Sequence, residues 1–299
     1  MNRLSTKVLN TQFKNPIITA SGTFGYGYEY KDYYEPSLLG GIASKGITWN
    51  KKDGNTGIRI WETPCGILNS IGLENPGVST FIEKYLKDMQ SLDTNILINL
   101  GGNTIDDYIK GVIALNDYDF FAIELNISCP NVKNGGMAFG TRCENAKMVV
   151  DAVRKATKHN LIVKLSPQAD DIVEVAKAVE NAGADGISLV NTFLAMAIDV
   201  ENLKNPFDNI YAGLSGSAIK PIALRMVHQV CKNVSIPVIG MGGITTGKDA
   251  LEFIMAGASL VQVGTANFIN PLAPVEIIKE MDEFLTRKNL TIDKIRGII

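Results

Sequence analysis

Short, continuous apolar runs recur along the chain, each followed by small or polar residues and then by an amphipathic stretch. Such runs, rich in Ile, Leu and Val, are typical of parallel strands that are buried on both faces. They predict strands at Pro16–Ala20, Gly41–Lys45, Asn95–Leu100, Phe120–Leu125, Leu161–Leu165, Gly186–Val190, Ile236–Gly240 and Leu260–Val263. The apolar spacing between them predicts helices at Phe81–Met89, Ile105–Leu115, Ala146–Thr157, Ile172–Ala182, Ala218–Val230 and Lys248–Ala256.

The alternation of strands and helices indicates an α/β fold. Eight such units in 299 residues fit a TIM (β/α)8 barrel better than the alternative of two doubly wound sheets. No linker divides the chain, so residues 1–299 are expected to form a single barrel domain. The stretch Ile47–Leu73 has no helical pattern. It is interpreted as a long excursion after the second strand that covers the C-terminal face of the barrel, because long loops in compact domains are usually functional.

Charge and cysteine usage exclude several classes of protein. The chain has 29 Lys and Arg against 31 Asp and Glu, without a basic block, which argues against a nucleic-acid partner. No stretch approaches the roughly 18 apolar residues of a membrane span, and the first ten residues do not resemble a signal peptide. The four cysteines never occur as Cys-x-x-Cys, so no metal or iron–sulfur site is expected in this chain. A cytoplasmic protein without membrane contact is expected.

Polar residues stand at or just after the ends of the predicted strands. They are Lys45, Asn99, Asn126, Lys164, Asn191 and Thr192. A single Asn in such a position is ordinarily a turn residue. The C-terminal ends of barrel strands converge on one active face, however, so the joint pattern predicts one pocket lined by lysine and amide groups.

Glycine-rich segments follow the last two predicted strands, at Gly240–Thr245 (GMGGIT) and Gly264–Thr265. Loops in these positions of a barrel frequently bind phosphate through backbone N–H groups, and glycine lets the backbone approach closely. A phosphate-binding cup is therefore expected. A dinucleotide fingerprint is the alternative, but its third glycine is replaced by Thr245. Glycine-rich turns that bind no ligand are a second alternative.

The general base is expected to be a thiol. His159 and His228 fall in or beside helices, which form the outer ring of a barrel, so neither should reach the pocket. Cys129 lies three residues beyond Asn126, on the loop after the fourth strand. The pKa of a thiol, ordinarily about 8.5, falls near cations such as lysine. A buried structural cysteine is the alternative, and Cys65 is the competing thiol.

Nine stretches of the chain match one known family. They are Ala20–Gly25, Ala43–Thr48, Asn69–Gly77, Asn126–Asn131, Lys164–Pro167, Asn191–Thr192, Gly213–Gly216, Gly240–Gly243 and Gly264–Thr265. Through these motifs the chain resembles the class 1 dihydroorotate dehydrogenases along almost its whole length. The combination of Asn-x-Ser-Cys-Pro-Asn with Asn-Ser-x-Gly-Leu is highly specific, whereas the barrel glycines alone are not.

The resemblance implies one FMN per chain and a bound substrate, and it places Cys129 on the family's catalytic base. The implied FMN-binding residues are Ser21, Lys45, Gly46, Asn99, Asn126, Lys164, Val190, Gly216, Gly242, Gly243, Gly264 and Thr265. The implied substrate-binding residues are Lys45, Asn69, Ser70, Ile71, Gly72, Leu73, Asn126, Asn131, Asn191 and Thr192.

The implied reaction is oxidation of (S)-dihydroorotate to orotate in de novo pyrimidine (UMP) biosynthesis. Cys129 is expected to remove a proton from ring C5 while a hydride leaves ring C6 for the flavin. Lys164 is the second catalytic residue and is expected to stabilise the reduced flavin. The loop from Cys129 to Gly140 has the composition of a closing lid. Membrane-associated class 2 relatives carry Ser in place of this Cys, so quinone reduction is not expected.

The run Asn131–Thr141 resembles the NAD-linked subclass 1B rather than the fumarate-linked subclass 1A. In subclass 1B the FMN subunit forms a homodimer and binds a second subunit that carries FAD and a 2Fe-2S cluster, which gives a heterotetramer. Subclass 1A is the first alternative. A tRNA dihydrouridine synthase, a flavin-free phosphate-binding barrel isomerase and a non-enzymatic flavin-binding subunit are the others.

Overall fold

A computed structural model of the chain describes residues 2–128 and 139–299. Eight parallel strands close into a barrel in the order in which they occur along the chain. They are β3 (Ile17–Thr19), β4 (Gly41–Ala43), β7 (Asn95–Gly101), β8 (Ala122–Asn126), β9 (Leu161–Lys164), β10 (Gly186–Leu189), β13 (Val238–Met241) and β14 (Leu260–Val263). Each overlaps one predicted strand, so the predicted α/β barrel is confirmed.

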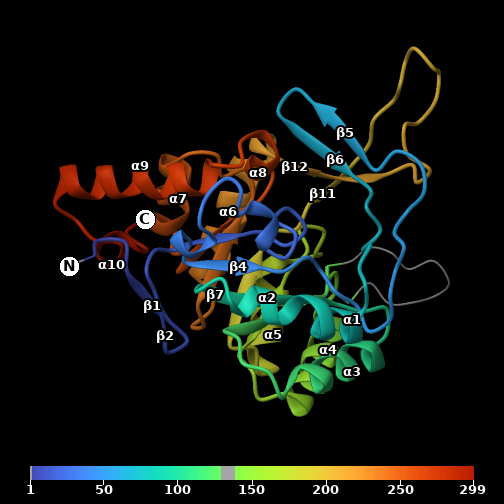
Figure 1. Cartoon of the computed structure of the whole chain (residues 1–299), viewed down its shortest axis with the longest axis horizontal. Coiled ribbons are helices and arrows are strands. Elements are labelled where there is room, and N and C mark those ends of the chain that lie inside the picture. Colours follow the sequence, from blue (N-terminus) through green and yellow to red (C-terminus); the bar gives the residue numbers. More distant parts are fainter. Residues whose placement is uncertain (1, 129–138) are drawn as a thin grey trace.

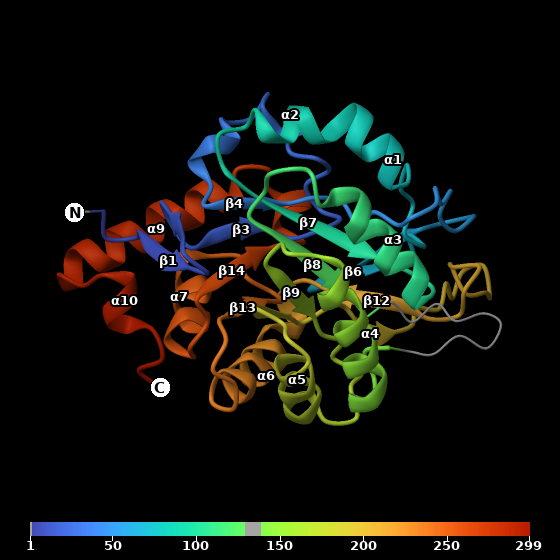
Figure 2. The same ribbon diagram turned by 90° about the horizontal axis from the view of Figure 1, so that it is seen from below.

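Helices surround the barrel strands on the outside (Figure 2). The longer ones are α3 (Ile105–Leu115), α4 (Cys143–Ala156), α5 (Ile172–Asn181), α6 (Lys220–Cys231), α7 (Gly247–Met255) and α9 (Ala273–Lys288), and the short ones are α1 (Val78–Phe81), α2 (Lys87–Gln90), α8 (Ala266–Ile269) and α10 (Ile292–Ile295). A π-helical turn at Ile82–Leu86 joins α1 to α2. Helix α9, which packs against β3, was not predicted, although it buries Ile277, Met281 and Leu285 at helical spacing.

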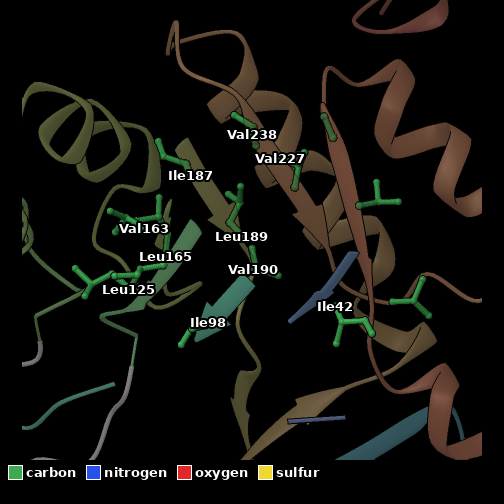
Figure 3. Packing of buried hydrophobic residues seen from close by; sticks show 14 of the residues in the cluster. Ile42, Ile98, Leu125, Val163, Leu165, Ile187, Leu189, Val190, Val227 and Val238 are labelled. Atoms are coloured by element: carbon green, nitrogen blue, oxygen red, sulfur yellow. The ribbon is translucent and has the colours of Figure 1, made fainter. Parts of the chain in front are cut away.

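The outward faces of the strands pack against the helices. Val227 of α6 and Val238 of β13 belong to one continuous core cluster, part of which is drawn in Figure 3. Val163 of β9 belongs to the same cluster, whereas its neighbour Lys164 faces a cavity at the end of the barrel. Successive residues of a strand point to opposite faces, so each buried strand has one face for the helices and one for the barrel interior.

An antiparallel hairpin of β1 (Thr6–Val8) and β2 (Thr11–Phe13) packs against one end of the barrel. Phe13 is fully buried in an apolar cluster with Ile18 and Leu97 from the strands. Its ring meets that of Phe121 edge to face, with centroids 4.9 Å apart. This apolar layer fills the interior on the hairpin side, so a polar site has room only toward the C-terminal ends of the strands.

A second, antiparallel sheet stands beyond the barrel (Figure 1). Its order is β11 (Phe193–Ala195), β12 (Ala212–Ser215), β6 (Gly66–Asn69) and β5 (Ile60–Thr63). Strands β5 and β6 fall inside the stretch Ile47–Leu73, for which no regular element was predicted. The apolar pattern missed them because the strands are short and because β6 pairs with a segment far away in the sequence, Asn69 lying opposite Gly213.

Within residues 2–128 and 139–299, no helix is both long enough and apolar enough to span a membrane.

Candidate functional site

A cavity of about 1500 Å³ opens where the barrel strands end, and residues of the second sheet form part of its wall. Ligand pockets usually measure about 300–1,000 Å³, so this one has room for two small molecules side by side. The structure brings nineteen of the candidate residues to its lining: Ser21, Lys45, Gly46, Asn69, Ser70, Ile71, Gly72, Leu73, Asn99, Asn126, Lys164, Val190, Asn191, Thr192, Gly216, Gly242, Gly243, Gly264 and Thr265.

The remaining candidates are two thiols, an asparagine and two histidines. Cys129 and Asn131 lie outside the described residues, as does most of the expected lid. Cys65, the competing thiol, lines the cavity. His159 stacks on Phe120 at a centroid distance of 4.1 Å, and His228 lies in the last turn of α6. Neither histidine lines the cavity, as expected from their positions in or beside the outer helices.

A buried carboxylate, Glu124 of β8, organises the floor of the cavity. Its Oε2 accepts a hydrogen bond from Asn99 Nδ2 at 2.6 Å. Its Oε1 accepts from Ser188 Oγ at 2.7 Å and from Gln262 Nε2 at 2.8 Å. The Nζ of Lys164 lies 3.9 Å from Oε2. Because the neighbours are donors and one carries a positive charge, this environment suits an ionised carboxylate.

Two buried oxygens on this floor lack a hydrogen-bond partner among the described residues. They are Asn99 Oδ1 and Gln262 Oε1, both belonging to side chains that line the cavity. Buried polar atoms in native proteins are nearly always hydrogen-bonded, so each of these acceptors can take an N–H or O–H donor from a bound molecule or a water. Lys164, whose side chain is 7% exposed, adds a cation to the same floor.

A chain of amides and hydroxyls forms another part of the lining. Ser128 Oγ donates to Asn126 Oδ1 at 2.6 Å and accepts from Asn191 Nδ2. The Oδ1 of Asn191 in turn accepts from the backbone N–H of Thr192 at 2.8 Å. Asn69 is held by a 3.1 Å bond from its Nδ2 to the Gly213 carbonyl. These bonds fix the orientation of amide groups whose donors and acceptors match those of a planar, polar ring.

Two basic side chains share one carboxylate near the second sheet. Glu74 Oε2 lies 2.7 Å from Arg59 Nη1 and 4.0 Å from Lys45 Nζ. The hydrogen bond from Arg59, followed by the charge of Lys45, lowers the pKa of Glu74. Lys45 and Glu74 both line the cavity, so a cation is available there for an anionic ligand.

A cradle of glycines forms where the chain follows β12 and β13. Gly216, Gly242 and Gly243 have φ angles of 108°, 126° and 75°, in the region that glycine adopts without steric cost. A Cβ on Gly243 would lie 2.9 Å from the Gly216 carbonyl oxygen and 2.8 Å from Lys220 Cβ. Only glycine therefore allows these two loops to approach each other beside the cavity.

The glycine run is not uniform in its role. Gly240 lies inside β13, and a Cβ placed on it would meet Phe253 of α7 at 2.7 Å. It serves the packing of strand against helix. Of the three glycines in this run, Gly242 and Gly243 line the cavity, as do Met241, Ile244 and Thr245.

Asp249 fixes the loop that follows this glycine pair. It forms a capping box with Thr246 at the start of α7, and its Oδ2 also accepts from the backbone N–H and the hydroxyl of Thr245. Lys220 Nζ lies 2.6 Å from Oδ1. Burial alone would raise the pKa of Asp249, but the hydrogen bonds from Lys220, Thr245 and Thr246 lower it to about 2.

The sequence patterns singled out neither Glu124 nor Asp249. A signal for Glu124 was present, because it is the one charged residue in the apolar run Phe120–Leu125 (FFAIEL), and a charge in a strand buried on both faces needs a partner. Asp249 stands three residues after Thr246, the spacing of a capping box. In the part of the chain that the structure describes, no three His, Cys, Asp or Glu side chains are grouped as metal ligands would be.

Comparison with known proteins gives matches over almost the full chain. The family model described as dihydroorotate dehydrogenase matches residues 3–285. Three similar relatives carry the name dihydroorotate dehydrogenase B (NAD(+)), catalytic subunit. The protein of Petrotoga mobilis is 56% identical over 299 residues, 99% of this chain and 100% of the relative. That of Brachyspira hyodysenteriae is 53% identical over 97% of this chain and 96% of the relative. That of Bacteroides thetaiotaomicron is 51% identical over 96% and 95%.

Proposed function

The chain belongs to the dihydroorotate dehydrogenase family, and from this membership and the geometry of the cavity we propose that it is an FMN-dependent enzyme that oxidises (S)-dihydroorotate to orotate in pyrimidine biosynthesis. The observation that carries the proposal is the cavity floor. There a buried lysine shares a cavity with a glycine cradle and with the amides of Asn99 and Gln262, whose oxygens have no hydrogen-bond partner among the described residues. One end of this cavity suits a heteroaromatic ring and the other suits a phosphate.

The described residues fit FMN at both ends. The acceptors Asn99 Oδ1 and Gln262 Oε1 suit an N–H group of the flavin ring, and the Lys164 ammonium suits its oxygen-bearing edge. Backbone N–H groups around Gly243 and Gly264 would hold the phosphate. Bound FMN would supply a two-electron acceptor for the hydride that leaves the substrate. The remaining volume of the 1500 Å³ cavity is available to the substrate.

The chain's own residues would bind the substrate and take its proton. We assign the amides of Asn69, Asn126 and Asn191 to the ring edges of dihydroorotate, and Lys45 to its negative charge. Cys129 would accept the proton from ring C5 as the hydride departs from C6, so that the carbon–carbon double bond of orotate forms. Lys164 would stabilise the negative charge that two-electron reduction places on the cofactor.

The electrons are proposed to reach NAD+ through a partner. Relatives named as NAD(+)-linked catalytic subunits support an additional subunit. We assign FAD and a 2Fe-2S cluster to that subunit, in a heterotetramer built on a homodimer of this chain, and we place the complex in the cytoplasm. Use of fumarate as the acceptor is the alternative.

Reconstitution tests the proposal in two stages. The purified chain is incubated with FMN and desalted, and orotate formation is followed with an artificial electron acceptor. Retained flavin and dihydroorotate-dependent turnover are expected. A colourless protein, or a yellow one that forms no orotate, would reject the proposed function. Co-purification from the source cell followed by an NAD-reduction assay tests the acceptor: NADH formation supports the NAD link, and turnover with fumarate but not NAD+ rejects it.

A further inference from the structure

Glu124 reaches the cavity only through other side chains. It is fully buried, it does not itself line the cavity, and its partners come from four different barrel strands, β7, β9, β10 and β14. Three of these partners, Asn99, Lys164 and Gln262, do line the cavity. A single carboxylate therefore contacts three side chains that line the cavity.

The carboxylate decides which end of each amide faces the ligand. An amide side chain has a donor end and an acceptor end of nearly equal shape. Glu124 accepts from Asn99 Nδ2 and from Gln262 Nε2, and the oxygens of both amides are left without a partner among the described residues. Were the amides reversed, their oxygens would face the carboxylate oxygens with no hydrogen between them, and a contact between two buried acceptors is unfavourable.

The same carboxylate reduces the positive electrostatic potential that the lysine produces in the cavity. Lys164 Nζ is 3.9 Å from Glu124 Oε2, and the two side chains are 7% and 0% exposed. At such burial, charges are weakly screened. Glu124 therefore offsets part of the positive potential that Lys164 contributes to the cavity floor.

We propose that Glu124 is a positioning residue for the flavin: it orients the Asn99 and Gln262 amides so that their oxygens can accept from the ring, and it moderates the charge of Lys164 on the same cavity floor. This inference rests on the proposed function, because it takes the ligand of the cavity floor to be FMN. It extends that function by assigning to one buried carboxylate the orientation of two amide acceptors and the moderation of the Lys164 charge.

Glu124→Gln tests both halves of the inference while keeping the shape of the side chain. Glutamine at position 124 can donate hydrogen bonds to Asn99 and Gln262. The two amides are then free to reverse, which would turn their oxygens toward residue 124 and away from the ligand. We expect the Kd of oxidised FMN to rise about tenfold, which is about 1.4 kcal/mol. Lys164 becomes uncompensated and favours the reduced, anionic flavin, so the midpoint potential of the bound flavin should shift upward. The readouts are fluorescence titration of the apoprotein and a redox titration.

Asp185→Asn is the matched control. Asp185 is also a carboxylate paired with a base, lying 2.7 Å from Arg154, but it immediately precedes β10 and does not line the cavity. The Asp185→Asn variant should be less stable than wild type, with no change in FMN affinity or in the midpoint potential of the bound flavin. If Glu124→Gln alters neither quantity, or alters them no more than Asp185→Asn does, the inference is overturned.

Gln262→Met serves if Glu124→Gln does not fold. It retains the Glu124–Lys164 pair and removes one acceptor, so FMN should bind less tightly with little change in potential. Unchanged affinity in this variant would also overturn the inference. Failure of the wild-type chain to bind FMN would instead reject the proposed function, so the two failures are distinguishable.

Discussion

Lys164 and Glu124 form a buried ion pair across neighbouring barrel strands, with Nζ 3.9 Å from Oε2. The parallel register of β8 and β9 brings them together by aligning Glu124 with Ile162 and Asn126 with Lys164. Removing one partner of a buried pair leaves an uncompensated charge, which typically costs about 3–5 kcal/mol. The pair therefore links the stability of the barrel to the charge that the cavity offers a cofactor.

Lys164→Ala is expected to lower the free energy of unfolding of the apoprotein by roughly 3–5 kcal/mol and to slow reduction of bound FMN. The double variant Lys164→Met/Glu124→Gln should recover most of the stability, because no unpaired charge remains, but not the reduction rate. Urea unfolding and stopped-flow reduction separate the two effects. A normal reduction rate in both variants would remove Lys164 from the catalytic scheme.

Cys129→Ala is expected to retain FMN and to lose turnover by about 10²-fold or more, the scale of a missing general base. Flavin content and steady-state rate are measured on the same preparation. Cys143→Ala is the control, since Cys143 begins α4 and burial raises the pKa of its thiol. Near-normal turnover of the Cys129 variant, or an equal loss in Cys65→Ala, would shift the role of base away from Cys129.

Gly243→Ala is expected to lower the affinity for FMN more than the affinity for riboflavin, which lacks the phosphate. Its φ is 75°, and the new Cβ would fall 2.9 Å from the Gly216 carbonyl oxygen, so the two loops must separate. Gly297→Ala is the control for strain alone, because φ there is 67°, the nearest atom to the new Cβ is 3.8 Å away, and Gly297 does not line the cavity. It should cost about 1–2 kcal/mol of stability. Equal losses of affinity for FMN and riboflavin would show that the phosphate does not bind at the Gly243 loop.

Asp249→Asn is expected to lower the free energy of unfolding by about 2 kcal/mol at pH 7, because the native pKa of about 2 lies well below the ordinary value. A carboxyl group whose pKa is lowered by folding stabilises the native state at pH values above its unfolded pKa. This stabilisation is lost as the pH falls through the native pKa. The difference from wild type should therefore shrink below about pH 4 and vanish only below about pH 2. Asp151→Asn, on an exposed pair with Lys147, should change stability by at most about 0.5 kcal/mol. A stability difference between Asp249→Asn and wild type that does not change with pH would contradict the lowered native pKa of Asp249.

The barrel could be predicted because strands buried on both faces and amphipathic helices leave strong periodic signals. The second sheet could not, because β6 and β12 are short and their pairing, Asn69 opposite Gly213, joins distant segments. Helix α9 was not predicted, although Ile277, Met281 and Leu285 stand at helical spacing.

The cavity residues could be predicted where they stand at strand ends, because the barrel gathers those ends on one face. The role of Glu124 could not. Its charge within an apolar run was visible, but its partners depend on strand register, which aligns it with Asn99 of β7, and on Ser188 and Gln262 from strands further around the barrel. The roles given to Cys129 and Asn131 rest on sequence alone and stay predictions.

Anaerobic titration of the FMN-loaded chain with dihydroorotate, in the absence of any partner subunit, tests the central claim most directly. The account predicts that the visible flavin absorbance bleaches with about one equivalent of dihydroorotate per FMN and that orotate appears in equal amount, since oxidation of the substrate removes two electrons. Flavin that stays oxidised in the presence of excess dihydroorotate would contradict it.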